Sequence, residues 1–278
     1  MNKDQKLLEE AYCKIYVSLK EPLYFGPEEH KQKWKEWLSI HSLNWKVNQE
    51  GSIDVRGSVI LNGEKRLNNP FLSLFPLKSL PFQFNSVEEI FDCRNNELTN
   101  LKGSPEIIGD SFLCYANLLE SLEGGPKVVK GNFTCYNNKL TSLKGSPEIV
   151  GESFDVSYNK ITSLEGAPKT VGLHFDCTFN NLTSLEGSPK VIKGNFDCSN
   201  NDGLRSLVGG PEIVEGDFDC RGAVLTSLKG APKVIKGQFI GFDFSDQDYR
   251  KYASRIEKTD KELSKDFSEE DLNILSDF

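Results

Sequence analysis

The chain of 278 residues is poor in histidine, methionine and long apolar stretches. It has three histidines and one methionine, and no window approaches 18 uninterrupted apolar residues. Because an apolar helix of about that length is needed to cross a bilayer, we expect no membrane contact. The first 19 residues are charged throughout and lack the apolar core of a signal peptide. The sequence therefore predicts a soluble, cytoplasmic protein.

Positive charge is also scarce. The chain has 33 Lys and Arg against 41 Asp and Glu, a formal net charge of −8. A protein that binds nucleic acid mainly through phosphates needs an excess of basic side chains, so we do not expect nucleic acid to be the main partner. The acidity is concentrated in residues 89–243, with 15 basic and 20 acidic side chains, and in residues 244–278, with 6 and 10.

Local signatures of catalysis and metal binding are missing. The sequence contains no nucleophile motif, no phosphate-binding loop and no Cys-x-x-Cys spacing. His174 stands near Asp176, an arrangement that can serve as an acid–base pair, but no other catalytic feature accompanies it. We expect no catalytic residue, cofactor or metal. An active site without a local signature could be hidden only in residues 1–88.

An internal repeat fills the middle of the chain. A phenylalanine recurs every 21 residues, with one step of 22. In the first seven units it is followed two residues later by Cys or Val, and in the first six it is followed five residues later by Asn. Each unit then passes through a Leu and a Gly-x-Pro segment and closes with an apolar pair such as Val128-Val129. The repeated phenylalanines are Phe91, Phe112, Phe133, Phe154, Phe175, Phe196, Phe218 and Phe239.

The repeat predicts a solenoid. In Phe-x-Cys, apolar and polar residues alternate with the period of a strand that buries one face. A unit with one short strand and no helix cannot bury that face alone, so the units should stack into a parallel sheet. The repeated Asn should bond neighbouring backbone at the bend and form a ladder of amides. Six of the seven cysteines share one core position, where Val156 substitutes once, and we interpret them as reduced packing residues.

Phe-x-Cys-x-x-Asn-x-Leu resembles the core of the leucine-rich repeat, Leu-x-Leu-x-x-Asn-x-Leu, over about residues 89–243. The phrase that begins Asn137-Asn138-Lys139-Leu140-Thr141-Ser142-Leu143 is most similar to that of uncharacterised repeat proteins encoded by tailed bacteriophages. This resemblance implies a virus-encoded protein that acts inside a bacterium, and it implies no chemistry. The departures are Val156 for Cys, Ala223 for Asn and an inserted residue near Asp202-Gly203, which suggest irregularity late in the array.

The fold class expected is a β-rich solenoid, leucine-rich-repeat-like, with a cap at each end. Residues 1–88 should form an α/β cap with amphipathic helices within 7–19 and 27–38, a hairpin over 45–55 and a degenerate first repeat strand at 59–61. Residues 89–243 should form seven to eight repeats. Residues 244–278 should form two short helices that cover the last sheet edge.

The outward-facing strand positions are the candidate binding residues. Five of seven central positions are Asp, and two charges about 5 Å apart repel by roughly 0.8 kcal/mol even in water. A cation or a basic partner would offset that repulsion. The alternative is that Ser153, Ser157, Asn195 and Ser199 solvate the carboxylates and that duplication copied them. The candidate residues on the concave face are Asp92, Arg94, Leu113, Tyr115, Thr134, Tyr136, Asp155, His174, Asp176, Asp197, Asp219 and Arg221.

Three hypotheses of function follow from this surface. The first is a non-catalytic protein-interaction module that binds a bacterial host protein with a basic surface, and that inhibits or redirects a component of defence or gene expression. The second is a structural or assembly component of a virion. The third is binding of nucleic acid or nucleotides through Tyr115, Tyr136 and the two arginines, which the net charge opposes.

Overall fold

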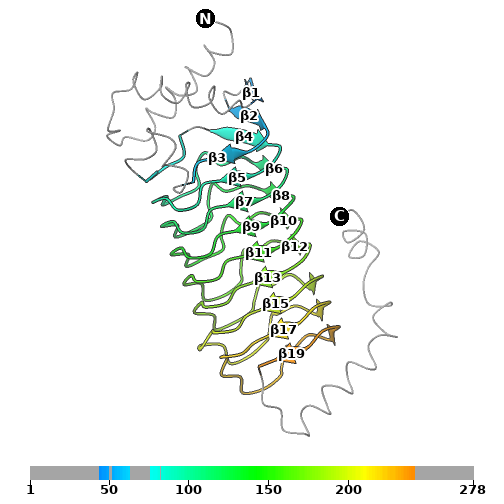
Figure 1. Cartoon of the computed structure of the whole chain (residues 1–278). Helices are drawn as coiled ribbons and strands as arrows, with labels where there is room; N and C mark the ends of the chain where they lie inside the picture. Colours follow the sequence, from blue (N-terminus) through cyan, green and yellow to red (C-terminus); the bar gives the residue numbers. More distant parts are fainter. Residues whose placement is uncertain (1–43, 50–51, 63–75, 82, 242–278) are drawn as a thin grey trace, which may run out of the picture.

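The computed structural model describes residues 44–49, 52–62, 76–81 and 83–241 of the chain. Within these residues the chain winds into a single stack of short turns (Figure 1). The helices predicted within 7–19 and 27–38 and the cap predicted over 244–278 lie outside the described residues.

The first strands extend the repeat array toward the N-terminus. β1 (Asn44–Val47) and β2 (Ile53–Arg56) pair antiparallel, which confirms the predicted hairpin. β3 (Val59–Ile60) pairs in parallel with β5 (Phe91–Asp92), as predicted for a degenerate first repeat strand. β4 (Phe84–Val87) joins β2 in parallel. The seven-stranded and the nine-stranded sheet of the solenoid therefore both begin before the first regular repeat.

Each turn contributes two short strands, whereas the sequence predicted one. The first strands begin at the repeated phenylalanine and form, with β3, one parallel sheet of nine strands. After β5 they are β7 (Phe112–Leu113), β9 (Phe133–Thr134), β11 (Phe154–Asp155), β13 (Phe175–Asp176), β15 (Phe196–Asp197), β17 (Phe218–Asp219) and β19 (Phe239–Ile240). We call this the first-strand sheet.

The apolar pair that closes each unit is the second strand. Val128 is half-buried and Val129 is fully buried, so the pair alternates as a strand does. Such strands continue the sheet of β1, β2 and β4 as far as β12, and a separate sheet holds the last three. They are β6 (Ile107–Ile108), β8 (Val128–Val129), β10 (Ile149–Val150), β12 (Thr170–Val171), β14 (Val191–Ile192), β16 (Ile213–Val214) and β18 (Val234–Ile235).

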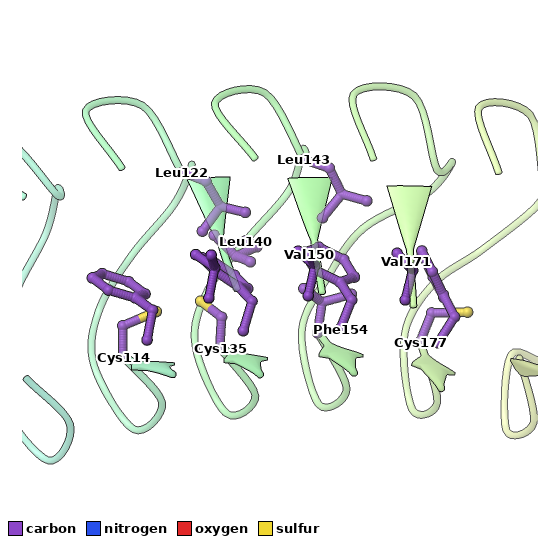
Figure 2. Close-up of a cluster of buried hydrophobic side chains, with 14 of the residues drawn as sticks. Cys114, Leu122, Cys135, Leu140, Leu143, Val150, Phe154, Val171 and Cys177 are labelled. Atoms are coloured by element: carbon purple, nitrogen blue, oxygen red, sulfur yellow. The ribbon is translucent and has the colours of Figure 1, made fainter. Parts of the chain in front are cut away.

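The core lies between the two sets of strands. Parallel pairing in register sets Phe154 opposite Phe175, and the ring centroids of these two residues are 5.2 Å apart. The repeated phenylalanine rings from Phe91 to Phe218 are fully buried, as are the repeated leucines from Leu101 to Leu207. Figure 2 shows how Val150 and Val171, from second strands, lie over Phe154, from a first strand, and Cys177, which directly follows one. The solenoid thus has one continuous apolar core.

The repeated cysteines are packing residues. All six within the described residues are buried free thiols, and Val156 occupies the same core column. Burial raises the pKa of Cys177 and Cys198 well above the ordinary value, and the nearby aspartates raise it further. A buried thiol that stays protonated is a poor nucleophile, which favours a packing role for Cys177 and Cys198.

The predicted ladder of amides is confirmed. The Nδ2 group of Asn159 donates to the carbonyl of Val156 on its own turn and, across turns, to the carbonyl of Cys135, both at 3.1 Å. Its Oδ1 accepts the N–H of Leu140 at 2.9 Å. The same three-way pattern recurs at Asn117, Asn138, Asn180 and Asn201. Each amide therefore joins two consecutive turns through buried backbone groups.

Candidate binding surface on the first-strand sheet

Five aspartates follow the repeated phenylalanine and form what we call the carboxylate ladder. Asp155 is the register partner of Asp176, and Asp176 is that of Asp197, which in turn faces Asp219. The sequence predicted that these side chains are exposed. Instead Asp92 and Asp219 are buried and the three middle ones are half-buried. The carboxylates are thus less exposed than their outward position predicted, because each one bonds back to its own turn.

Every member of the ladder accepts a backbone hydrogen bond from the residue two positions later. Oδ1 of Asp155, Asp176 and Asp197 each accepts such an N–H at 2.9 Å. The Ser157 hydroxyl also donates to Asp155, at 2.7 Å. Of the four neighbours predicted to solvate the ladder, Ser157 and Ser199 therefore do so. Ser153 and Asn195 instead bond to residues of adjacent turns.

The two ends of the ladder are neutralised by arginine. Arg221 Nη2 lies 2.6 Å from Asp219 Oδ2, and Arg94 Nε lies 3.4 Å from Asp92 Oδ2. No basic side chain of the described residues forms an ion pair with Asp155, Asp176 or Asp197. This contrast is central to the site, because three adjacent, half-buried carboxylates carry charge that the described part of the chain does not balance.

Burial raises the pKa of all three middle carboxylates above the ordinary value of 3.8, and the hydrogen bonds from the turn partly oppose that rise. A neighbouring aspartate raises the pKa of Asp176 and of Asp197 further. The ladder is therefore a place where a proton, or an outside cation, is better tolerated than on an isolated aspartate.

The raised pKa values predict how stability depends on pH. A carboxylate whose pKa is higher in the folded state binds its proton more tightly there, so its stabilising contribution is present below 3.8 and is lost as pH rises through the raised pKa. We expect the variant Asp155→Asn/Asp176→Asn/Asp197→Asn to be more stable than the wild type at neutral pH, and the difference to shrink in acid. Urea unfolding of both proteins, from neutral pH down to pH values below 3.8, measures this difference in stability. A difference that stays constant or grows in acid would contradict the prediction.

Beside the ladder, Tyr115 and Tyr136 stack with their ring centroids 4.3 Å apart. The Arg94 guanidinium lies 5.3 Å from the Tyr115 ring centroid and donates a hydrogen bond to its hydroxyl. Burial and the Tyr115 hydroxyl raise the pKa of Tyr136, and the charge of Asp155 raises it further. The aromatic stack and the ladder therefore adjoin. Leu113 and Thr134, the half-buried residues of the same two turns, stand where other turns have Asp.

His174 and Asp176 do not form the acid–base pair that their spacing allowed. The His174 side chain is exposed, and its Nδ1 accepts the N–H of Asn195 at 2.9 Å. Asp176 instead accepts the N–H of Thr178. Within the described residues no hydrogen bond joins the imidazole to that carboxylate, so His174 acts here as a link between turns.

A second aromatic pair was missed by the sequence reasoning. Tyr158 and Phe179 stack with ring centroids 4.4 Å apart and have 54% and 45% of their surface exposed. Each of them directly precedes the repeat asparagine of its turn. At this position other turns have Asn95, Asn137 and Asn200. The signal was available, because an aromatic residue twice replaces the repeat's usual Asn. The predicted binding residues all came from strand positions and their immediate neighbours, and this position lies at a bend.

Neither a metal site nor a membrane span is found in the part of the chain that the structure describes. No group of three His, Cys, Asp or Glu side chains among these residues is arranged to hold a metal ion. No helix among these residues is long and apolar enough to cross a bilayer. The features that stand out are the carboxylate ladder and the two aromatic pairs.

The fold is a leucine-rich-repeat-like β-solenoid of about seven turns of 21 residues. No family model and no curated protein sequence matches the chain. Among solved structures it is similar to YopM from Yersinia enterocolitica WA-314, with 15% sequence identity and a TM-score of 0.29. The match covers 86% of this chain and 61% of the other, so the chain spans less than two thirds of that protein. A likeness this distant does not extend to function.

Proposed function

We propose that this protein is a non-catalytic protein-binding module, and that its first-strand sheet receives a basic surface of another protein. One observation supports this most directly. Asp155, Asp176 and Asp197 stand in register without a basic partner among the described residues, while Asp92 and Asp219 at the two ends each have an arginine.

The second-strand side of the solenoid provides the contrast. There, opposite charges on successive turns meet in exposed ion pairs such as Lys127–Glu106 at 2.9 Å and Lys144–Glu123 at 2.6 Å. The chain thus balances carboxylates from turn to turn on one side and leaves three unbalanced on the other. Lysine or arginine side chains of a partner would complete the ladder, and such complementarity favours fast and selective association.

The repeat phrase supports a more specific proposal. Its resemblance, from Asn137 to Leu143, to repeat proteins of tailed bacteriophages suggests a phage-encoded protein that acts in the bacterial cytoplasm. Its partner would then be a host protein of defence or gene expression, which it inhibits or redirects. The face of the solenoid, rather than any reacting group, would select that target.

The test compares two variants that remove the same number of charges from opposite sides. The ladder variant is Asp155→Asn/Asp176→Asn/Asp197→Asn, in which each amide oxygen still accepts the backbone N–H. The control is Glu106→Gln/Glu123→Gln/Glu148→Gln, whose wild-type carboxylates each pair with an exposed lysine. Affinity capture from bacterial lysate with quantitative mass spectrometry should show a protein held by wild type and control and lost by the ladder variant. Equal capture by all three would refute the proposed role of this face.

A further inference from the structure

The exposed pair of Tyr158 and Phe179 occupies positions that suit large aromatic residues poorly. Both residues have a backbone φ of 52°, in the left-handed region. That conformation is unfavourable for a bulky residue by roughly 1–2 kcal/mol and suits Asn much better. Asn95, Asn137 and Asn200 adopt it in other turns. Two large apolar rings therefore stand in solvent at positions that also strain their backbone, as expected for residues retained for contact with a partner.

The pair adjoins the carboxylate ladder. Ser157, whose N–H and hydroxyl bond to Asp155, directly precedes Tyr158. In the next turn Thr178, whose N–H bonds to Asp176, directly precedes Phe179. Each ring thus belongs to the same turn as one of the carboxylates and directly follows the residue that donates a hydrogen bond to that carboxylate. Together they form an aromatic and acidic surface on consecutive turns, which Asp197 extends by one more turn.

We propose that Tyr158, Phe179 and the three middle carboxylates dock a basic amphipathic helix of the partner protein, laid along the axis of the solenoid. This inference rests on the proposed function and specifies the partner's segment. Charge complementarity selects a cationic segment, because no basic side chain of the described residues pairs with Asp155, Asp176 or Asp197. The exposed rings favour arginine in particular, since guanidinium groups stack on aromatic faces.

The spacing of the turns selects a helix over an extended strand. Consecutive turns are 5.2 and 5.3 Å apart at the buried ring centroids of Phe154, Phe175 and Phe196. At the exposed rings of Tyr158 and Phe179 the spacing is 4.4 Å. Side chains three or four residues apart on a helix are spaced by about 5–6 Å along one face. An extended strand presents same-face side chains about 6.6–6.8 Å apart and loses register after two turns. A helix can therefore set one basic residue against each of the three carboxylates.

The probe is a synthetic alanine-rich peptide of about 18 residues, long enough to form a helix, with arginine at every third or fourth position on one face. Its comparator has the same charges and a central proline, which breaks the helix. Fluorescence anisotropy with the full chain should show the helical peptide bound about tenfold more tightly than the proline peptide. The variant Tyr158→Asn/Phe179→Asn, which restores the residue used in other turns, should bind the helical peptide about tenfold more weakly without becoming less stable.

Equal binding of the two peptides, or unchanged binding by the Tyr158→Asn/Phe179→Asn variant, would overturn the inference. Its failure can be told apart from that of the proposed function. If the ladder variant still loses the captured protein while the peptides are not discriminated, the face binds a protein by another segment and only the helix is wrong. If the ladder variant captures as well as the wild type, the proposed function itself is refuted.

Discussion

Replacing Asn180 with alanine is expected to lower the free energy of unfolding by about 3–5 kcal/mol. The amide donates to the carbonyls of Val156 at 3.0 Å and Cys177 at 3.2 Å, and it accepts the N–H of Ile161 at 3.1 Å. Alanine would leave these backbone groups buried without their partner, and each such group costs about 1–3 kcal/mol. Chemical denaturation with linear extrapolation measures the loss.

The neighbouring residue supplies the control. The Asn181 side chain is exposed, and Asn181→Ala removes the same atoms from the surface one residue away. That change should alter stability by no more than about 0.5 kcal/mol. Similar losses in the two variants would mean that the amide ladder does not bind the turns together.

Replacing Phe154 with alanine should destabilise the protein by about 3–5 kcal/mol, because the ring is fully buried and its loss leaves a cavity. The ring lies between those of Phe133 and Phe175, at centroid distances of 5.3 and 5.2 Å. Parallel strands in register hold these neighbours in place, so the site has little freedom to collapse. Thermal and denaturant unfolding should both show the change.

Removing an exposed phenylalanine ring tests whether burial is the cause of this loss of stability. Phe179→Ala removes an identical ring that is 45% exposed and whose backbone φ is 52°. Its effect on stability should be below about 1 kcal/mol, because little buried surface is lost. The outcome that contradicts this view is a loss as large as that of Phe154→Ala. It would show that the exposed pair supports the fold rather than a partner.

The 21-residue period was enough to predict the solenoid, the buried cysteine column and the amide ladder. All three follow from the repeat itself, because a residue that recurs at the same position of every unit stacks on its equivalents in the neighbouring turns. The second strand of each turn was not predicted. A pair such as Val128-Val129 is too short for its alternation to be read, and it becomes a strand only because the neighbouring turn offers hydrogen-bond partners in parallel.

The candidate surface was predicted less completely. The sequence indicated which residues alternate outward, and the structure places Asp155, Asp176 and Asp197 on consecutive strands as that alternation requires. It did not indicate that the aspartates would fold back onto their own turns, because that depends on the N–H two residues later being free of strand pairing. Nor did it reveal Tyr158 and Phe179, whose stacking depends on a bend conformation rather than on strand alternation.

The substitution of Ala223 for asparagine has a mechanical consequence. Among the described residues, Asn201 is the last repeat asparagine whose buried amide ties its turn to the one before, through the N–H of Leu182. The corresponding N–H of Leu204 bonds to the carbonyl of Asn201 instead. Within the described residues, the turns beyond this point are joined by sheet pairing and by contacts such as the exposed ion pair of Lys236 and Glu215, but by no buried repeat asparagine. Under heat or tension the stack should therefore unwind first from its C-terminal end. The proposed docking surface lies on turns that Asn159, Asn180 and Asn201 join, so it would stay folded while the last turns unfold.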